Sequence, residues 1–174
     1  MNRQAYLAAE YGPFRWYDKP SAHLRAALVF PNVYHLGMSN LGFQLIWKAA
    51  HEHPQTAAER VFLPDPDQNA TPESLETGRK LRDFDLLAFA LSYEQDYLNV
   101  LRMLDLGRIP RRARERTADH PLVIGGGPAL WGNPEPVAPF LDAIVIGDGE
   151  EAIGQVLDLL DAYRDASPAG RAGA

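Results

Sequence analysis

The stretch FDLLAFALSYEQDYLNVLRMLDLG, residues 84–107, decides the fold class. Residues 86–91 are apolar almost without interruption, which is typical of a strand that is covered on both faces. Residues 97–106 then carry apolar side chains at helical spacing, and Gly107 stands where such a helix would end. A buried strand followed at once by a helix is the repeating unit of a parallel sheet.

The sequence on both sides of this stretch continues the alternation. Ser39 is expected to cap a helix that runs through Ala49, and a last helix is expected after Gly149. Strands are expected at residues 25–30, 61–63, 86–91, 122–124 and 143–146.

Five strands separated by helices predict an α/β fold. We expect a five-stranded parallel sheet of the flavodoxin or Rossmann-like type, in the order 2-1-3-4-5, with helices on both faces. Such sheets bind ligands beyond the carboxyl ends of their strands, at the point where the strand order reverses. The loops that follow the strands are therefore the candidate sites.

The two ends differ in composition from this alternating region. Residues 1–20 are rich in aromatic residues and turn formers and are expected to form an extended N-terminal arm. Residues 165–174 (DASPAGRAGA) have the small, polar composition of a flexible tail or linker. Residues 21–164 are expected to form one domain, which a length of 174 residues also favours.

Composition excludes several classes of function. The sequence has 23 acidic and 17 basic residues and a net charge of −6, which argues against a duplex-DNA binder. The arginines between residues 108 and 116 are expected to form a solvated face. No apolar run is long enough to span a membrane and no secretory signal is visible, so a cytoplasmic protein without a membrane partner is expected.

The chain contains no cysteine, which rules out disulfides, a thiolate nucleophile and any cysteine-held zinc or iron–sulfur cluster within it. It also has no nucleophile elbow, no phosphate-loop lysine and no convincing Ser/His/Asp set. The sequence therefore does not contain a complete active site, and catalysis by this chain alone is disfavoured.

Two glycine-containing loops have both a functional and a structural interpretation. The loop at residues 31–40 leads into a helix N-terminus and could cradle a phosphate or another polar ligand, or could be an ordinary capped turn. The glycines at 125–127 could let the backbone approach a bulky ligand, or could serve only a tight turn. A large ligand there would need an apolar-floored cleft over the strand ends, which Leu36, Met38, Leu91, Tyr93 and Leu130 could line.

Several segments occur together, in this order, in one known family. FPNVYHLGMSNLG (30–42), AERVFLPDPD (58–67) and SLET (74–77) precede the stretch quoted above, and PLVIGGGPALWGNPEPVAPFLDAIVIGDGEE (121–151) follows it. About residues 10–160 thus resemble the N-terminal domain of a family of radical SAM proteins. In that family, a domain of the cobalamin-binding type precedes the radical SAM barrel.

The resemblance implies a Rossmann-like domain whose strand-end loops hold the corrin ring and nucleotide tail of cobalamin. The domain would position this cofactor for a separate catalytic domain, a radical SAM barrel in the same chain or in a partner chain. The residues at the matching positions are Asn32, His35, Gly37, Met38, Ser39, Asn40, Ser92, Tyr93, Glu94, Gly125, Gly126, Gly127, Pro128, Gly147, Asp148, Gly149 and Glu150.

The sequence departs from related patterns in two places. Cobalamin-dependent mutases carry D-x-H-x-x-G, whose histidine binds cobalt. Residues 32–37 read NVYHLG here, so His35 is a candidate cobalt ligand that the missing aspartate and altered spacing disfavour. Because cysteine is absent, the [4Fe–4S] cluster and S-adenosylmethionine would belong to another domain or a partner.

The alternative function is a cofactor-free Rossmann-like domain that docks a partner or a substrate within the same radical SAM system. A nucleic acid held against the arginines near 108–116 is one form of this alternative, which the net charge disfavours.

Overall fold

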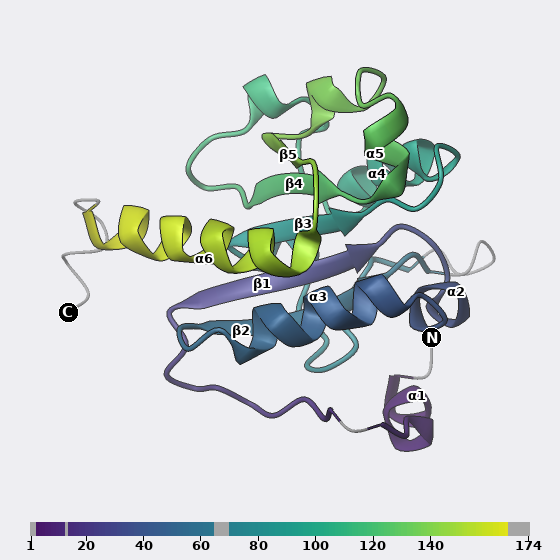
Figure 1. Cartoon of the computed structure of the whole chain (residues 1–174), viewed down its shortest axis with the longest axis vertical. Helices are drawn as coiled ribbons and strands as arrows, with labels where there is room; N and C mark the ends of the chain where they lie inside the picture. The colour runs from purple at the N-terminus through teal and green to yellow at the C-terminus, as the bar shows by residue number, and fades with distance from the viewer. Residues whose placement is uncertain (1–2, 13, 65–69, 167–174) are drawn as a thin grey trace.

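The computed structural model describes residues 3–12, 14–64 and 70–166, and its centre is a five-stranded sheet (Figure 1). Every pair of neighbouring strands is parallel, and the order is β2-β1-β3-β4-β5. The predicted fold class and strand order are confirmed. The strands are β1 (Leu24–Phe30), β2 (Thr56–Phe62), β3 (Leu86–Ala90), β4 (Leu122–Gly126) and β5 (Ala143–Val145).

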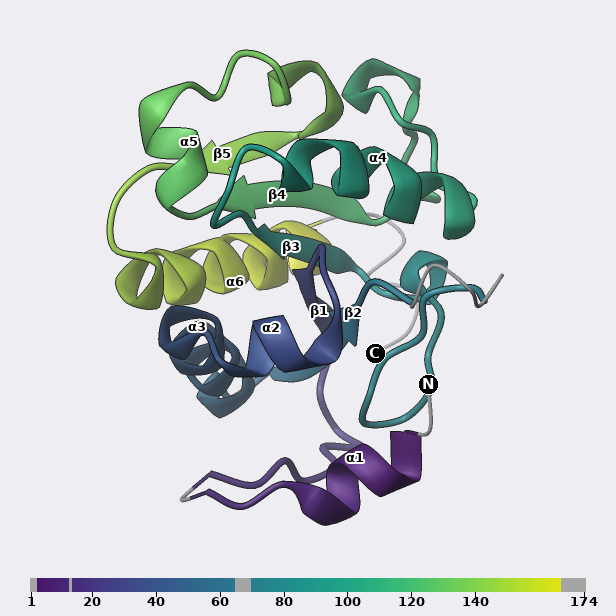
Figure 2. The same cartoon turned by 90° about the vertical axis from the view of Figure 1, so that its right-hand side faces the viewer.

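Helices cover both faces of the sheet, as predicted (Figure 2). On one face lie α3 (Leu41–Glu52) and α6 (Gly149–Ala166), and on the other lie α4 (Asp96–Leu106) and α5 (Pro128–Gly132). Shorter elements complete the fold: α1 (Arg3–Ala9), α2 (Tyr34–Met38) and three 3₁₀ turns, η1 (Leu81–Asp83), η2 (Ala113–Glu115) and η3 (Ala138–Phe140).

Successive strand residues enter two separate cores, because side chains alternate across a sheet. In β1, Ala27 and Val29 pack in the core beneath α4, whereas Leu28 and Phe30 pack in the core beneath α3 and α6. Both sets are buried, which explains why the strand reads as a continuous apolar run.

The start of α3 differs from the prediction. Residues 34–38 form the short helix α2, so Ser39 lies at its end, where its hydroxyl donates to the carbonyl oxygen of Leu36 at 2.8 Å. The cap of α3 is Asn40, whose side-chain oxygen accepts from the backbone N–H of Phe43 at 2.9 Å. The predicted Ser39 cap is therefore wrong by one residue.

Strand β2 begins at Thr56, earlier than the predicted residues 61–63. The prediction started too late because Glu59 and Arg60 are charged, yet both are fully buried. The Arg60 guanidinium donates from Nε to Glu76 at 2.6 Å and from its terminal nitrogens to both carboxylate oxygens of Glu10, at 2.7 and 2.9 Å. Glu59 accepts from the hydroxyls of Ser74 and Thr77, both at 2.6 Å. Because their charges are paired in this way, Glu59 and Arg60 can lie inside a strand over which the apolar pattern does not extend.

The N-terminal arm is not extended throughout, because residues 3–9 form α1. Its later part packs against α3 and β2: Trp16 donates from Nε1 to the carbonyl oxygen of Ala58 at 3.1 Å. Lys19 donates to the carbonyl oxygens of His51, of His53 at 2.9 Å and of Thr56 at 3.2 Å. The arm is thus held by ordered contacts with the domain.

At the other end, α6 continues to Ala166, and the remainder of the predicted tail, residues 167–174, lies outside the described residues. In the described part of the chain, no helix combines the length and apolarity that crossing a membrane requires.

We predict that His51 makes the domain sensitive to acid. Its imidazole is fully buried among the rings of the arm, and its Nδ1 accepts from the backbone N–H of Ala58 at 3.2 Å. Burial, with a smaller contribution from the Lys19 charge, lowers the pKa of His51 to about 4. In the unfolded chain this histidine has a pKa of about 6.5 and is protonated at pH 5, whereas in the folded chain it stays mostly neutral at that pH. The free energy of unfolding should therefore fall by about 2 kcal/mol between pH 7 and pH 5.

Urea unfolding of the wild type and of His51→Asn at both pH values tests this prediction. Asparagine can still accept from Ala58 but cannot titrate, so this variant should lose less stability on acidification. Equal losses in the two proteins would show that His51 does not cause the acid sensitivity.

We also predict that Gly127, directly after β4, does not tolerate a side chain. Its φ is 116°, a region that L-residues rarely adopt, and a Cβ there would lie 2.6 Å from the carbonyl oxygen of Leu91. Gly127→Ala should reduce the free energy of unfolding by about 2 kcal/mol or more. Gly132→Ala is the control, since a Cβ at Gly132 meets nothing within 4 Å. Similar unfolding midpoints for Gly127→Ala and the wild type would refute the prediction.

Candidate functional site

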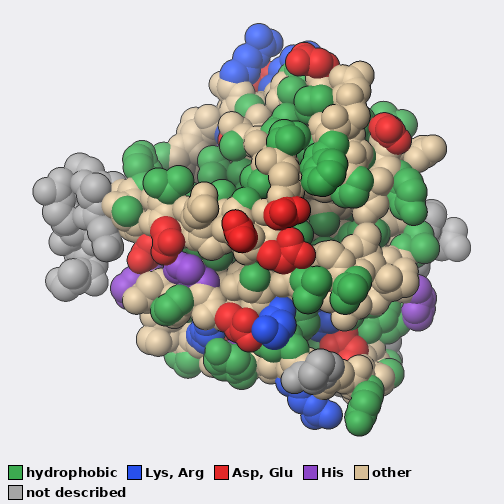
Figure 3. Space-filling view, in the orientation of Figure 1, with side chains coloured by type: hydrophobic (Ala, Val, Ile, Leu, Met, Phe, Trp, Pro, Cys, Tyr) green, Lys and Arg blue, Asp and Glu red, His purple; other side chains and the backbone are tan. Residues whose placement is uncertain are grey.

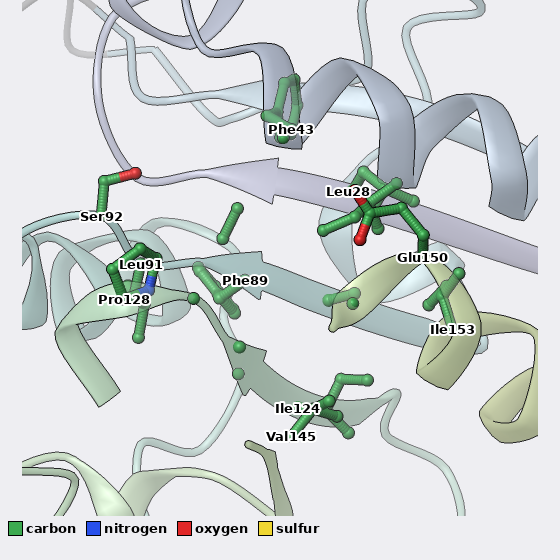
Figure 4. A pocket seen from close by; sticks show the side chains of 18 of the residues that line it. Leu28, Phe43, Phe89, Leu91, Ser92, Ile124, Pro128, Val145, Glu150 and Ile153 are labelled. Atoms are coloured by element: carbon green, nitrogen blue, oxygen red, sulfur yellow. The ribbon is translucent and has the colours of Figure 1, made fainter. Parts of the chain in front are cut away.

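A cavity of about 380 Å³ opens at the carboxyl ends of the strands, between α3 and α6. Figure 3 shows this face of the molecule, with acidic side chains near its centre. Figure 4 shows the cavity from close by: Leu28 and Ile124 come from the sheet, Phe43 from α3 and Ile153 from α6. The surroundings are mostly apolar, which is usual for sites that bind organic ligands.

The cavity exists because three neighbouring strand positions have almost no side chain. Ala88 and Ala90 of β3 and Gly126 of β4 lie on the face covered by α3 and α6, and Ala90 is paired directly with Gly126. A Cβ on Gly126 would lie 3.6 Å from the Cβ of Val145, an ordinary contact. A side chain at Gly126 would therefore fit without strain and would fill the cavity.

Gly125 is required for a different reason. Side chains alternate across the strand, so a Cβ on Gly125 would point to the opposite face, where it would lie 2.7 Å from Cδ1 of Leu141. Within the run of three glycines, the first therefore allows packing, the second leaves the cavity open, and Gly127 makes the turn.

A hydrogen bond joins the two loops at the point where the strand order reverses. The Asn40 side chain donates from Nδ2 to the Ser92 hydroxyl oxygen at 3.0 Å while its own oxygen caps α3. Asn40 follows β1 and Ser92 follows β3, and the chain continues to opposite faces of the sheet from these neighbouring strands. This is the crevice in which open α/β sheets commonly bind their ligands.

Acidic groups provide the only charges that line the cavity among the described residues. Asp148 and Glu150 lie at its mouth, at the start of α6, and no described lysine, arginine or histidine contributes to the lining. A ligand that brings hydrogen-bond donors suits this mouth better than a phosphate does. Because Asn40 already takes the Phe43 N–H, the loop at residues 31–40 fits the capped-turn interpretation.

Ten of the predicted site residues are brought together here. The loops 125–128 and 147–150 contribute all of their predicted residues, whereas the loops 32–40 and 92–94 contribute one residue each. Those that line the cavity are Asn40, Ser92, Gly125, Gly126, Gly127, Pro128, Gly147, Asp148, Gly149 and Glu150.

Most of the first predicted loop lies elsewhere because α2 turns it away. His35 is exposed beside the rings of Tyr6 and Tyr34, with ring centroids 5.6 and 5.4 Å away. Gly37 is buried against Phe62, where a Cβ would lie 2.5 Å from the ring.

The remaining predicted residues also make contacts outside the cavity. Asn32 donates to Asp96 at 3.0 Å, and the Met38 sulfur accepts from Arg60 at 3.2 Å. Ser39, Tyr93 and Glu94 are exposed and do not contribute to the lining. Of the expected cleft residues, Leu91 lines the cavity, whereas Leu36, Met38, Tyr93 and Leu130 do not.

Sequence reasoning missed most of the apolar lining. Leu28, Phe43 and Ile153 are core residues by pattern, and only the fold shows that they also border an open space. A usable signal was present in LLAFA, where the small residues Ala88 and Ala90 alternate with larger ones and so share one face.

Two of the five arginines near 108–116 form local ion pairs. Arg111 forms an ion pair with Asp105, and Arg116 forms one with Asp142 at 3.0 Å while also donating to the carbonyl oxygens of residues 110, 111 and 140. These contacts favour a structural role for this loop. Across the residues that the structure describes, no group of three or more metal-ligating side chains comes together.

Comparison with known proteins agrees with this architecture. The family described as "Radical SAM proteins, N-terminal" matches residues 42–172, which is most of the chain. An uncharacterized protein of Methanocaldococcus jannaschii is 23% identical over 124 residues, covering 71% of this chain and 24% of that protein. The chain thus spans about a quarter of the length of this curated relative. Because the family match extends over more than half of its residues, the chain belongs to the family of radical SAM protein N-terminal domains.

Proposed function

We propose that this domain binds a corrinoid at the cavity and positions it for the iron–sulfur catalytic domain of a radical SAM protein. The observation that carries the proposal is the apolar cavity at the carboxyl ends of the strands, opened by the missing side chains at Ala88, Ala90 and Gly126. Membership in the radical SAM N-terminal family indicates that the catalytic partner is a radical SAM domain.

The size of the cavity suggests how such a ligand would enter. A volume of about 380 Å³ is near the lower end of the range of about 300–1,000 Å³ for ligand pockets. A whole corrinoid is much larger than this. In the proposed complex, the flat base of the nucleotide tail enters between α3 and α6, and the corrin ring stays outside, over the mouth.

The polar groups of the mouth suit this ligand. A corrinoid carries peripheral amides and a ribose, whose N–H and O–H groups could donate to the carboxylates of Asp148 and Glu150, while the phosphodiester of its nucleotide tail would lie away from these carboxylates. The backbone of the glycine loops allows close approach of a broad ring. A bound corrinoid would supply a cobalt centre that can carry a methyl group or change its oxidation state, and this chain would hold and orient it.

The proposal assigns no protein ligand to cobalt. His35 lies outside the cavity lining, and its ring packs beside Tyr6 of the N-terminal arm. A base held by the residues of the cavity would not be available to cobalt, and we propose that His35 would not take its place.

Titration of the purified domain with hydroxocobalamin tests the proposed function. We expect about one equivalent of corrinoid to remain bound through gel filtration, with a spectrum that indicates a displaced base. Gly126→Val should weaken binding by about tenfold or more, since its side chain would occupy the cavity. Ala143→Val is the matched control, because it adds similar bulk to an exposed position of β5 outside the lining.

Loss of corrinoid by the wild-type domain at concentrations near about 100 µM would contradict this proposal. It would leave the cofactor-free docking domain as the better description. Equal binding by Gly126→Val and the wild type would show that any corrinoid is bound somewhere other than the cavity.

The absence of a histidine ligand has its own test. His35→Ala should bind hydroxocobalamin with the same affinity and the same visible spectrum as the wild type, because this imidazole lies outside the cavity lining. A shift of the cobalt absorption bands in the variant would instead identify His35 as a ligand. Ser39→Ala, on the same loop, controls for a general loosening of α2.

A further inference from the structure

Four large apolar side chains are exposed at the carboxyl edge of the sheet. Leu41 is 68% exposed, Tyr93 66%, Trp131 59% and Ile146 60%, although each belongs to a residue type that folding usually buries. We call these four residues the apolar rim.

The apolar rim lies beside the cavity lining. Trp131 itself lines the cavity, and each of the other three is a direct chain neighbour of a lining residue: Leu41 of Asn40, Tyr93 of Ser92 and Ile146 of Gly147. The four residues come from the loops or helices that follow four different strands. Exposed apolar groups that gather from separate segments around a pocket are typical of a protein interaction surface.

We infer that the apolar rim is the surface on which the catalytic domain of the radical SAM protein docks, so that this domain closes over the cavity mouth. The inference rests on the proposed function for its account of why the mouth must be covered. The family is defined as the N-terminal part of radical SAM proteins, and the matched region is only 24% of the curated relative. A large additional domain of this class is therefore the appropriate occupant.

The charges at the mouth specify the chemistry of the partner surface. Asp148 and Glu150 line the cavity together with Trp131 of the apolar rim, and both are exposed. No described basic residue lines the cavity beside them. The docking face of the catalytic domain should thus carry an apolar patch with lysine or arginine side chains opposite these carboxylates.

The direction of α6 adds a constraint on how the two domains can be connected. The helix begins at the cavity mouth and runs back along the sheet to the opposite edge (Figure 1). Its 18 residues span about 27 Å. A catalytic domain that follows α6 in the same chain must return over this distance to reach the apolar rim, which takes a linker of about eight extended residues or more.

Site-specific photocrosslinking in the native cells tests this inference. The crosslinking amino acid p-benzoylphenylalanine replaces Tyr93 in one strain and Tyr163 in another, with the protein at its natural length. Tyr163 is a matched control: it is 73% exposed, but it lies on α6 away from the mouth. We expect Tyr93 to crosslink about tenfold more efficiently than Tyr163 to a polypeptide segment that carries the three-cysteine cluster motif, identified by mass spectrometry.

Weakening the apolar rim should reduce this crosslink. Leu41→Ser combined with Ile146→Ser, in the strain that carries the probe at position 93, should lower its yield by about tenfold, because both side chains would lose buried contacts. An unchanged yield would overturn the inference. So would a Tyr93 crosslink mainly to a second copy of this chain, or one no stronger than that of Tyr163.

Hydroxocobalamin binding by the unmodified domain separates the two proposals. If corrinoid is retained but the Tyr93 crosslink is absent, the docking surface is wrong and the corrinoid site stands. If the crosslink to the cysteine-bearing segment forms but corrinoid is not retained, the docking surface stands and the cofactor assignment is wrong.

Discussion

The cavity depends on an unequal distribution of side-chain volume across the two faces of one sheet. Beneath α4, the strand ends are filled by residues such as Phe89 and Leu91, and Gly125 admits Leu141. Beneath α3 and α6, the paired residues Ala90 and Gly126 leave the corresponding space open. The helices cannot collapse into it, since Gly149 already brings α6 so close to α3 that a Cβ would lie 2.7 Å from Ile46. Interiors pack tightly elsewhere, and this local gap is why we propose the cavity as a ligand site.

The β2 edge of the sheet is closed by buried charge. Arg60 joins β2 to Glu76 in the segment that covers the sheet edge and to Glu10 in the arm, and its guanidinium lies 3.9 Å from the centroid of the Trp47 ring. Leaving one such partner unpaired inside a protein is costly, so the network fixes the arm and the edge segment together. An edge strand that is paired and covered in this way is also protected from aggregation.

These features divide the molecule into a rigid support and an open edge. The arm, β2 and the Arg60 network stabilise one end, while the cavity, the carboxylates of Asp148 and Glu150 and the apolar rim share the carboxyl edge. The sequence contains no cysteine. Membership in the radical SAM N-terminal family is consistent with a domain that acts by holding and positioning, with the reactive chemistry carried by another domain.

The sequence alone determined the fold class and the strand order, and it pointed to two of the loops that line the cavity, 125–128 and 147–150. Hydrophobic periodicity is a local property, and a parallel α/β sheet has few allowed connections. It predicted β2 only in part, at residues 61–63, because Glu59 and Arg60 break the apolar pattern and their partners are distant in the chain. Only the tertiary structure decided that Asn40 and Ser92 meet while His35 turns away with α2. The tertiary structure also decided that Ala88, Ala90 and Gly126, on adjacent strands, share one face of the sheet and leave a cavity. Strand register and helix placement follow from the packing of the whole chain, so a local pattern does not determine them.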